Sequence, residues 1–277
     1  CKEKEVVTGI VQRYIGRNVS VDLGKIDAIL PEAEQVKGET FQRTERIKVY
    51  ILEVKDSPKG PRISVSRTHP DLVRRLFEAE IAEVRDGTVE IRAIAREAGS
   101  RTKIAVSSTD PNVDPVGACV GLNGARVNAI VNELRGEKID IINWDDNPAY
   151  LIENALSPAK VICVVADEDA KEAQVIVPDY QLSLAIGKGG LNIKLASQLT
   201  GYDIDVYREL DQAQEEDVNL DEFADEIEGW VIDELKRVGC DTAKSVLELS
   251  ESELESRTDL EIETIREVLN ILKAEFE

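Results

Sequence analysis

The stretches Gly121-Leu122-Asn123-Gly124 and Gly187-Lys188-Gly189-Gly190 decide the fold, because one four-residue pattern occurs twice in matching surroundings. The copies start 66 residues apart. Each follows a short apolar stretch and precedes an amphipathic segment that ends at a glycine, Gly136 or Gly201. Alternating runs at 138–142 and 202–207 then predict a strand after each copy. A helix, a Gly-x-x-Gly turn, a second helix and a strand form the core of a KH domain.

The glycines suit contact with a nucleic-acid backbone, because residues without Cβ bend sharply and allow close approach. A helix begins at each loop, so its free N–H groups and the positive end of its dipole face a bound phosphate. A single Gly-x-x-Gly is more often an ordinary helix connection, and the repetition is what favours RNA binding. The predicted RNA-binding residues of the repeats are Gly121, Leu122, Asn123, Gly124, Arg126, Gly187, Lys188, Gly189, Gly190, Asn192 and Lys194, with Arg101 and Lys103 nearby.

A nucleotide-binding P-loop is excluded by the residues around Lys188. The P-loop pattern requires glycine at the position of Leu182 and a hydroxyl side chain at the position of Gly189. Neither is present.

The first seventy residues contain five short alternating runs separated by turn residues, which predicts an OB-type β-barrel. Such barrels bind single strands with basic grooves and aromatic side chains. The candidates here are Arg43, Arg46 and Lys48, with Tyr14, Phe41 and Tyr50 as aromatic platforms. The alternative is that Tyr50 belongs to the core and the charges form a solvated strand face.

Charge is unevenly distributed along the chain. The formal net charge is −21. Residues 211–277 hold 22 acidic and 6 basic residues, which leaves a net charge of only −5 for residues 1–210. Nucleic-acid binders usually carry a basic stripe, so the cations must cluster locally near the loops.

The order of a barrel followed by two KH units resembles the NusA family of bacterial transcription elongation and termination factors, with an S1-type barrel and paired type II KH domains. The resemblance rests on Ser66–Pro70, Asp114–Gly121 and Leu184–Ala196, and it extends over residues 4–210. The type II order agrees with an extra helix and strand predicted before each core, at 70–83 with 88–96 and at 148–155 with 160–166. The resemblance implies binding of single-stranded nascent RNA and contact with RNA polymerase and other transcription factors.

Two features depart from this family. A basic residue is usual at the third position of the first loop, where this chain has Asn123, so that loop is expected to hold phosphate less tightly. The family's N-terminal polymerase-binding domain has no counterpart, and the chain begins with Cys1 and contains no methionine. We therefore expect a fragment of a longer protein.

The last sixty residues are predicted to be helical. Leu220, Phe223, Ala224, Ile227, Trp230, Val231 and Leu235 recur at helical spacing, and Ile265 to Phe276 carry a second apolar stripe. Gly239 is placed as a helix stop, and Ser250-x-x-Glu253 and Thr258-x-x-Glu261 have the capping-box form. Short helices with tight turns resemble a helix-hairpin-helix domain. Its charge favours a basic protein surface as partner over DNA, and a role in solubility alone is the alternative.

Composition narrows the remaining function classes. No apolar run approaches the roughly 20 residues needed to span a bilayer, and no signal peptide opens the chain. Four separated cysteines and one histidine suggest neither a disulfide framework nor a metal site. We expect a cytoplasmic, monomeric, non-enzymatic protein without cofactor or membrane contact.

The sequence therefore predicts a multidomain α+β protein that binds RNA and regulates pausing, termination and antitermination of transcription. Its predicted domains are an S1-type OB-fold at 1–68, type II KH domains at 69–147 and 148–210, and an acidic linker with an all-α helix-hairpin-helix-like domain at 211–277. Two alternatives remain. One is an RNA-processing enzyme of the S1/KH type or its RNA-binding part, although such enzymes place KH before S1. The other is a protein-binding adaptor whose KH domains are degenerate.

Overall fold

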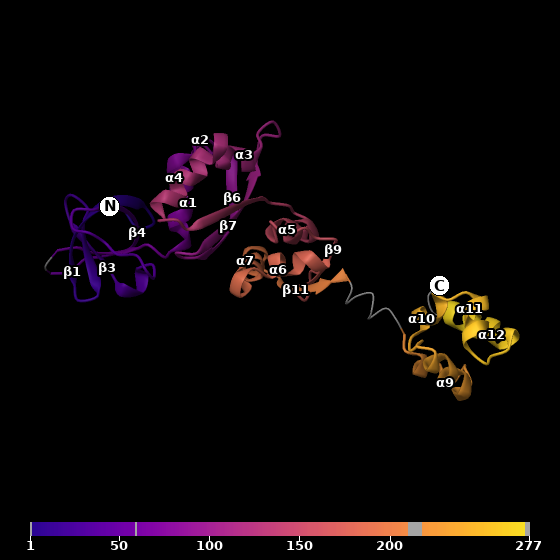
Figure 1. The fold of residues 1–277 in the computed structure, drawn as a ribbon. Helices are drawn as coiled ribbons and strands as arrows, with labels where there is room; N and C mark the ends of the chain where they lie inside the picture. Colours follow the sequence, from indigo (N-terminus) through magenta and orange to yellow (C-terminus); the bar gives the residue numbers. More distant parts are fainter. Residues whose placement is uncertain (1, 59, 210–217, 275–277) are drawn as a thin grey trace. The chain divides into compact units, whose positions relative to one another are not determined.

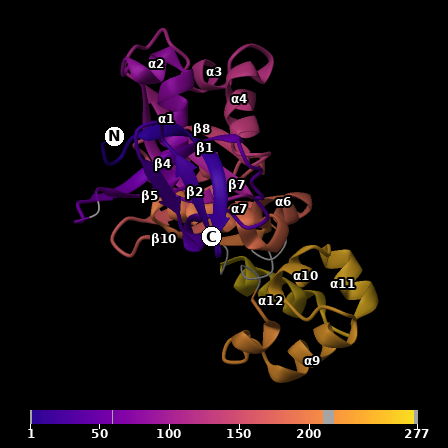
Figure 2. The same ribbon diagram turned by 90° about the vertical axis from the view of Figure 1, so that its left-hand side faces the viewer.

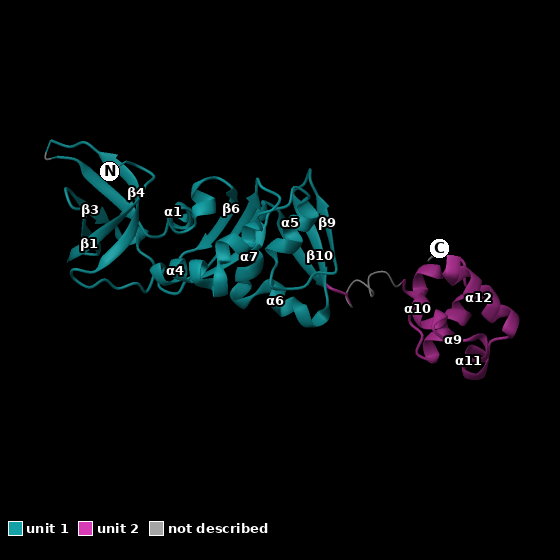
Figure 3. Ribbon diagram, turned by 90° about the horizontal axis from the view of Figure 1, so that it is seen from above, with its two compact units in different colours: residues 1–207 teal, residues 208–277 magenta. Residues whose placement is uncertain are grey.

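The computed structural model describes residues 2–58, 60–209 and 218–274 (Figure 1). The chain forms two compact units, residues 1–207 and residues 208–277 (Figure 3). The first unit contains the barrel and both KH folds, and the second contains helices. None of the helices in the described ranges is long and apolar enough to cross a membrane.

Five strands close into a barrel at the start of unit 1, as the alternating runs predict (Figure 2). Their order around the barrel is β1, β2, β3, β5, β4. Alternate residues such as Val19, Val21, Val49 and Val65 are fully buried inside it, because successive side chains of a strand point to opposite faces. The strands are β1 (Val6–Ile15), β2 (Asn18–Asp22), β3 (Asp27–Leu30), β4 (Arg46–Lys55) and β5 (Arg62–Ser66).

The first KH fold places its helices on one face of a three-stranded sheet of order β6-β7-β8. Strands β6 and β7 are antiparallel, and β7 and β8 are parallel. Each of the helices α1 and α3 begins with a proline after a capping side chain, His69 or Asp114. The elements are α1 (Pro70–Glu80), α2 (Ala82–Arg85), β6 (Val89–Glu97), β7 (Arg101–Ser108), α3 (Pro115–Val120), η2 (Leu122–Gly124), α4 (Ala125–Glu133) and β8 (Lys138–Asn143).

The second KH fold repeats this order, with a sheet of order β11-β10-β9. Its helices share one hydrophobic core with Ala95, Ala105 and Ile142 on the sheet of the first KH fold. The two KH folds are therefore packed against each other through buried apolar contacts. The elements are α5 (Pro148–Ala155), β9 (Cys163–Asp167), β10 (Glu172–Val177), η3 (Asp179–Gln181), α6 (Leu182–Ile186), η4 (Lys188–Gly190), α7 (Leu191–Thr200) and β11 (Asp203–Arg208).

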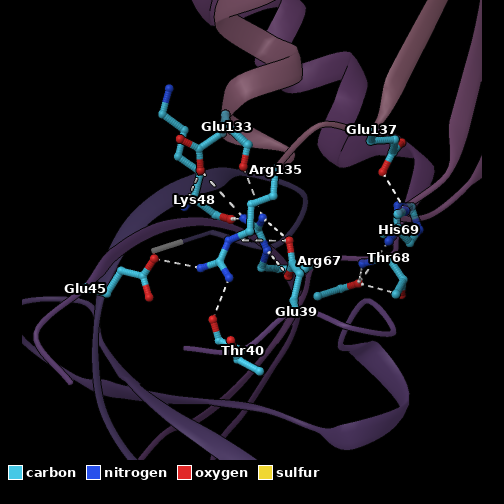
Figure 4. A network of polar contacts seen from close by, with 12 residues as sticks. Glu39, Thr40, Glu45, Lys48, Arg67, Thr68, His69, Glu133, Arg135 and Glu137 are labelled. Carbon is cyan, nitrogen blue, oxygen red and sulfur yellow. Dashed lines mark hydrogen bonds and ion pairs between the residues drawn. The ribbon is translucent and has the colours of Figure 1, made fainter. Parts of the chain in front are cut away.

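A buried arginine joins the barrel to the first KH fold (Figure 4). Arg67 donates to both carboxylate oxygens of Glu39, at 2.8 and 2.6 Å, and to the carbonyls of Lys48 and Glu133 at 2.8 and 3.1 Å. Its side chain is 1% exposed. Arg135 strengthens the same contact between the barrel and the first KH fold, because its guanidinium donates to the Thr40 carbonyl of the barrel domain at 2.6 Å.

A second buried pair, Arg96 with Glu137, ties the first KH sheet together. Both hydrogen bonds of the pair are 2.9 Å long, and the two side chains are 1% and 0% exposed. Glu137 also accepts from the Thr102 hydroxyl at 2.6 Å and from the Gly99 N–H at 2.8 Å. Burial alone raises the pKa of Glu137, but these donors outweigh it and hold that pKa below its ordinary value.

Unit 2 packs its short helices around one apolar core that includes Leu220, Val231 and Leu269. The predicted capping box at Ser250 and Glu253 is confirmed, and Gly239 follows α9 with the left-handed φ of 92° that suits a helix stop. The elements are η5 (Leu220–Phe223), α9 (Gly229–Arg237), α10 (Ala243–Leu247), α11 (Glu251–Arg257) and α12 (Ile262–Ala274).

Two expectations for this unit are wrong. The Thr258 hydroxyl donates to the Leu254 carbonyl at 2.7 Å at the end of α11, so it closes one helix and does not cap the next. Trp230 was expected on the apolar stripe, but its side chain is 56% exposed, because Val231 and Ile232 of α9 occupy the core positions.

Replacing Glu137 with glutamine should destabilise unit 1 by about 3–5 kcal/mol, because Arg96 would keep a buried charge without its counterion. Urea unfolding of the full chain measures the change. Lys194→Ala is the matched control, since it breaks an exposed ion pair with Glu97 that is worth less than about 1 kcal/mol. A similar loss in both variants would contradict the prediction.

The difference in the free energy of unfolding between the wild type and Glu137→Gln should also depend on pH. The pKa of Glu137 is lowered in the folded protein, so its stabilising contribution is complete above its ordinary pKa and is lost as the pH falls through the lowered one. The gap between the wild type and Glu137→Gln should therefore narrow below about pH 4.

Candidate nucleic-acid interface

The two Gly-x-x-Gly loops have the same backbone conformation despite their different sequences. In both, the first, third and fourth residues have positive φ, which costs residues with a Cβ roughly 1–2 kcal/mol and favours glycine. Asparagine is among the few other residues that adopt it readily, which accounts for Asn123. The φ and ψ angles are 74° and 176° at Gly121, 52° and 28° at Asn123, 75° and 13° at Gly124, 77° and 171° at Gly187, 62° and 25° at Gly189, and 74° and 12° at Gly190.

The first glycine of each loop is required for a further reason. A Cβ at Gly121 would lie 2.8 Å from Cγ of Arg126, and one at Gly187 would lie 2.7 Å from Cβ of Asn192. At Gly190 a Cβ would meet open space. The side chain two positions after the loop therefore packs directly over the loop's first residue.

Arg126 and Asn192 occupy matching positions, and each donates a hydrogen bond to the helix that precedes its loop. The Arg126 guanidinium donates to the Ala118 carbonyl at 2.7 Å, and the Asn192 amide donates to the Ala185 carbonyl at 2.9 Å. Both carbonyls belong to the last turn of the helix before the loop, where intrahelical partners are missing. Each side chain thus fastens the two helices around its loop.

These contacts correct part of the prediction for the two residues. Asn192 is 5% exposed, and its amide also donates to the Leu156 carbonyl at 3.1 Å, so it is buried beneath the loop surface. Arg126 is half-buried and forms an ion pair with Glu83 at 3.0 Å. Asn192 therefore supports the second loop through buried hydrogen bonds, whereas part of the Arg126 side chain remains accessible to solvent.

The tips of both loops lie on the surface. Leu122 is 86% exposed, and Asn123, Lys188 and Gly189 are also exposed. No side chain caps the N-terminus of α4 or α7. The N–H groups of Ala125 and Leu191, the first residues of these helices, donate to the loop carbonyls of Leu122 and Lys188. An anion at the loops would therefore meet the positive ends of the two helix dipoles.

The cations predicted beside the loops have different environments. Lys103 is fully buried, with its Nζ 2.7 Å from the Ser157 carbonyl and 3.3 Å from Asp140, so its assignment to the RNA surface is wrong. Burial lowers the pKa of Lys103, and Asp140 partly offsets that effect. Arg101 pairs with the same aspartate at 2.7 Å. Lys194 is exposed and pairs with Glu97 at 2.8 Å.

The barrel offers cations but not the expected aromatic surface. Arg43 and Arg46 are exposed, and Arg43 lines a surface pocket of about 500 Å³ with Arg13 and Gln12. Lys48 is half-buried, and its backbone belongs to the joint with the first KH fold.

The aromatic side chains of the barrel serve mainly structural contacts. Phe41 and Tyr50 are buried, and Tyr50 stacks on His69 with 4.5 Å between the ring centroids, so the prediction of these two as platforms is wrong. Tyr14 is 48% exposed, and its hydroxyl accepts from the Phe41 N–H at 3.0 Å.

An open pocket of about 510 Å³ lies between the two KH folds. It begins at Val116 of α3 and Ile141 of β8 and continues to Lys160, which precedes β9. Sequence reasoning missed this pocket because its residues carry no motif. Its lining residues are Val116, Ile141, Ile142, Asn143, Glu153, Asn154, Ser157, Ala159, Lys160 and Val161.

A β-barrel followed by two packed KH folds, each with an exposed glycine loop, defines a class of protein built to hold single-stranded nucleic acid. Comparison with known families agrees with the KH folds. A profile described as the NusA-like first KH domain matches residues 67–144, and one described as the NusA-like second KH domain matches residues 148–214.

Known proteins similar to this chain share the name transcription termination/antitermination protein NusA. The protein from Halalkalibacterium halodurans is 55% identical over 80% of this chain, and that from Bacillus subtilis is 57% identical over 76%. The Thermus thermophilus protein is 52% identical over 73% of this chain. The matched parts cover 58%, 57% and 53% of these relatives, so this chain spans little more than half of their length. The chain belongs to the NusA family.

The glycine geometry predicts unequal effects of alanine in the second loop. Gly187→Ala should destabilise unit 1 by more than the roughly 1–2 kcal/mol of a strained φ, because the new methyl group collides with Asn192. Gly190→Ala should cost only the roughly 1–2 kcal/mol of the strained φ, since its Cβ would meet open space. Urea unfolding of both variants compares their losses of unfolding free energy. Equal losses would show that the protein accommodates the new methyl group next to Asn192 without cost.

Proposed function

We propose that this chain holds single-stranded nascent RNA and acts on transcription, as part of a longer factor that regulates pausing, termination and antitermination. The observation that carries the proposal is the repeated loop geometry: two exposed glycine loops of one conformation, each at an uncapped helix N-terminus. KH loops of this kind clamp about four nucleotides each. The names of the relatives support the same role, since each is a transcription termination/antitermination protein.

The RNA contacts in this proposal come from the exposed members of the predicted set. Phosphate would lie at the positive N-terminal ends of α4 and α7, with Lys188 as the cation of the second loop. Arg126, Lys194 and Arg101 would contribute after exchanging their present carboxylate partners, and Arg43 and Arg46 would extend the contact onto the barrel. The pocket between the KH folds lies beside α3 and β8, where RNA leaving the first loop would pass.

Unit 2 is proposed to bind a protein, with RNA polymerase or another transcription factor as the partner. Its charge opposes nucleic acid, and Trp230 lines a hollow of about 300 Å³ whose rim carries Glu226, Glu228 and Glu267. An aromatic ring among carboxylates suits a basic protein surface. We further propose a monomeric, cytoplasmic protein without catalytic activity, cofactor or membrane contact.

Binding of unstructured RNA by the full chain over a range of salt concentrations tests the proposal. A nucleic-acid contact requires affinity to fall with rising salt, because bound phosphates release counterions. The absence of binding at low salt would favour the adaptor alternative, and shortening of the RNA during incubation would favour the enzyme alternative.

Reversing the charge of the second loop should weaken RNA binding strongly. Aspartate at both Lys188 and Gly189 places carboxylates where phosphate is received. Both positions are exposed, and aspartate at the positive φ of residue 189 costs at most about 1–2 kcal/mol, so the fold should persist. We expect a loss of about tenfold or more. The matched change at Leu122 and Asn123 should cost less, since that loop begins without charge. Unchanged affinity in a variant that still unfolds cooperatively would remove the second loop from the interface.

A reciprocal exchange between the loops provides a finer test. Lys188→Leu should reduce the slope of log affinity against log salt by about 0.7, and Leu122→Lys should increase it by about 0.7, the value for one single-strand phosphate contact. Both positions are the second of their loop, outside the positions of positive φ, so neither change strains the backbone. If the two slopes stay equal to that of the wild type, neither tip faces phosphate.

A further inference from the structure

The largest exposed aromatic surface near the second loop belongs to Tyr180. Its side chain is 77% exposed in η3, directly before α6, and among the described residues its hydroxyl has no hydrogen-bond partner. Single exposed apolar residues are common and need no explanation. Tyr180, however, has exposed apolar neighbours along the same segment, since Leu184 and Ile186 are 43% and 37% exposed.

These side chains lead toward the glycine loop. Tyr180 lies in η3, two residues before α6 begins at Leu182, and Lys188 follows at the loop tip. Helix α6 rises about 6 Å from Leu182 to Ile186 at 1.5 Å per residue, and Tyr180 precedes it by two residues. A segment of four nucleotides spans about 10 Å even at the stacked spacing of 3.4 Å, so one bound segment can reach both the loop and the ring.

Further contacts bring the pocket between the KH folds next to Tyr180. The Lys160 N–H donates to the Gln181 side chain at 3.0 Å, and Lys160 lines that pocket. Ile162, two residues further, is 50% exposed. Tyr180 is therefore next in sequence to a residue that contacts the edge of this pocket.

The first KH fold lacks this arrangement. Counting back 66 residues, Asp114 stands in place of Tyr180, Ala118 in place of Leu184 and Val120 in place of Ile186. The Asp114 carboxylate accepts from the Val116 N–H at 3.2 Å and caps α3. The two clefts therefore share their loop geometry but differ in the surface that a base would meet.

We propose that Tyr180 stacks on a base of the RNA whose phosphates lie at the second loop, and that this contact gives the second KH fold a preference for purines. The inference rests on the proposed function and names a specificity residue of the same site. A base is the occupant that the surroundings favour, because the exposed ring precedes the short helix that leads to the glycine loop and its cation Lys188, and single-strand binders combine aromatic rings with cations. Purines have the larger stacking surface, so the ring discriminates between bases without hydrogen bonds.

The test compares Tyr180→Ala, Tyr180→Leu and Tyr180→Phe in the full chain, with oligoadenylate and oligouridylate of about 12 nucleotides as probes. Removing the ring should weaken oligoadenylate binding about fivefold or more, the range for loss of one stacked base, and should weaken oligouridylate binding less. Tyr180→Phe should retain wild-type affinity, whereas Tyr180→Leu should resemble alanine. The salt slope should not change, because the ring contacts no phosphate.

Tyr150 provides the matched control, since it is 57% exposed on α5 and its replacement by alanine should leave affinity unchanged. Wild-type affinity in Tyr180→Ala would overturn the inference, as would an equal loss in Tyr150→Ala or a loss in Tyr180→Phe as large as in alanine. Failure of the proposed function itself is distinguishable, because then the wild type would show no salt-dependent binding to either probe.

Discussion

The close approach of residue 126 or 192 to the first glycine of each loop is the contact on which the candidate interface depends. It lets the helix after the loop cross tightly behind the helix before it, and the turn then requires positive φ at three of its four residues. The consequence is chemical as well as steric. The positive end of the second helix begins at the surface, without a side-chain cap, next to a glycine too small to shield it.

The loops are held by contacts that extend into the rest of unit 1. Asn192 connects the second loop to the Leu156 carbonyl, and the next carbonyl along the chain, that of Ser157, accepts from Lys103 in the first KH sheet. That sheet is in turn tied by Arg96 and Glu137. Buried charges and amides are costly unless fully paired, so displacement of any one of these groups is strongly unfavourable. The distance between the two loops is thus restrained by polar contacts as well as by the shared apolar core.

The sequence was informative wherever function required an unusual backbone. Paired glycines, helix caps and alternating runs predicted both KH folds, the barrel and the family, because those features depend on local geometry. The side chains around the loops were harder to assign. Lys103 and Asn192 look like surface groups in a linear sequence. Lys103 is buried where the first KH fold packs on the second, and Asn192 is buried among the helices of its own fold. The sequence pointed to no role for Tyr180, because a single tyrosine before a helix carries no motif.

The negative net charge is compatible with the proposed RNA binding, because the cations of this chain have different roles. Three cations form buried ion pairs, namely Arg67, Arg96 and Lys103. Three more are paired with carboxylates nearer the surface, namely Arg101, Arg126 and Lys194. Net charge is therefore a poor guide to affinity in this chain. In the proposed binding mode, helix N-termini and an exposed ring attract phosphate and bases without contributing formal charge, so the cleft is compatible with a negative net charge. If RNA binds as proposed, the carboxylates that pair with Arg101, Arg126 and Lys194 are displaced, and this exchange would disfavour ligands with few phosphates.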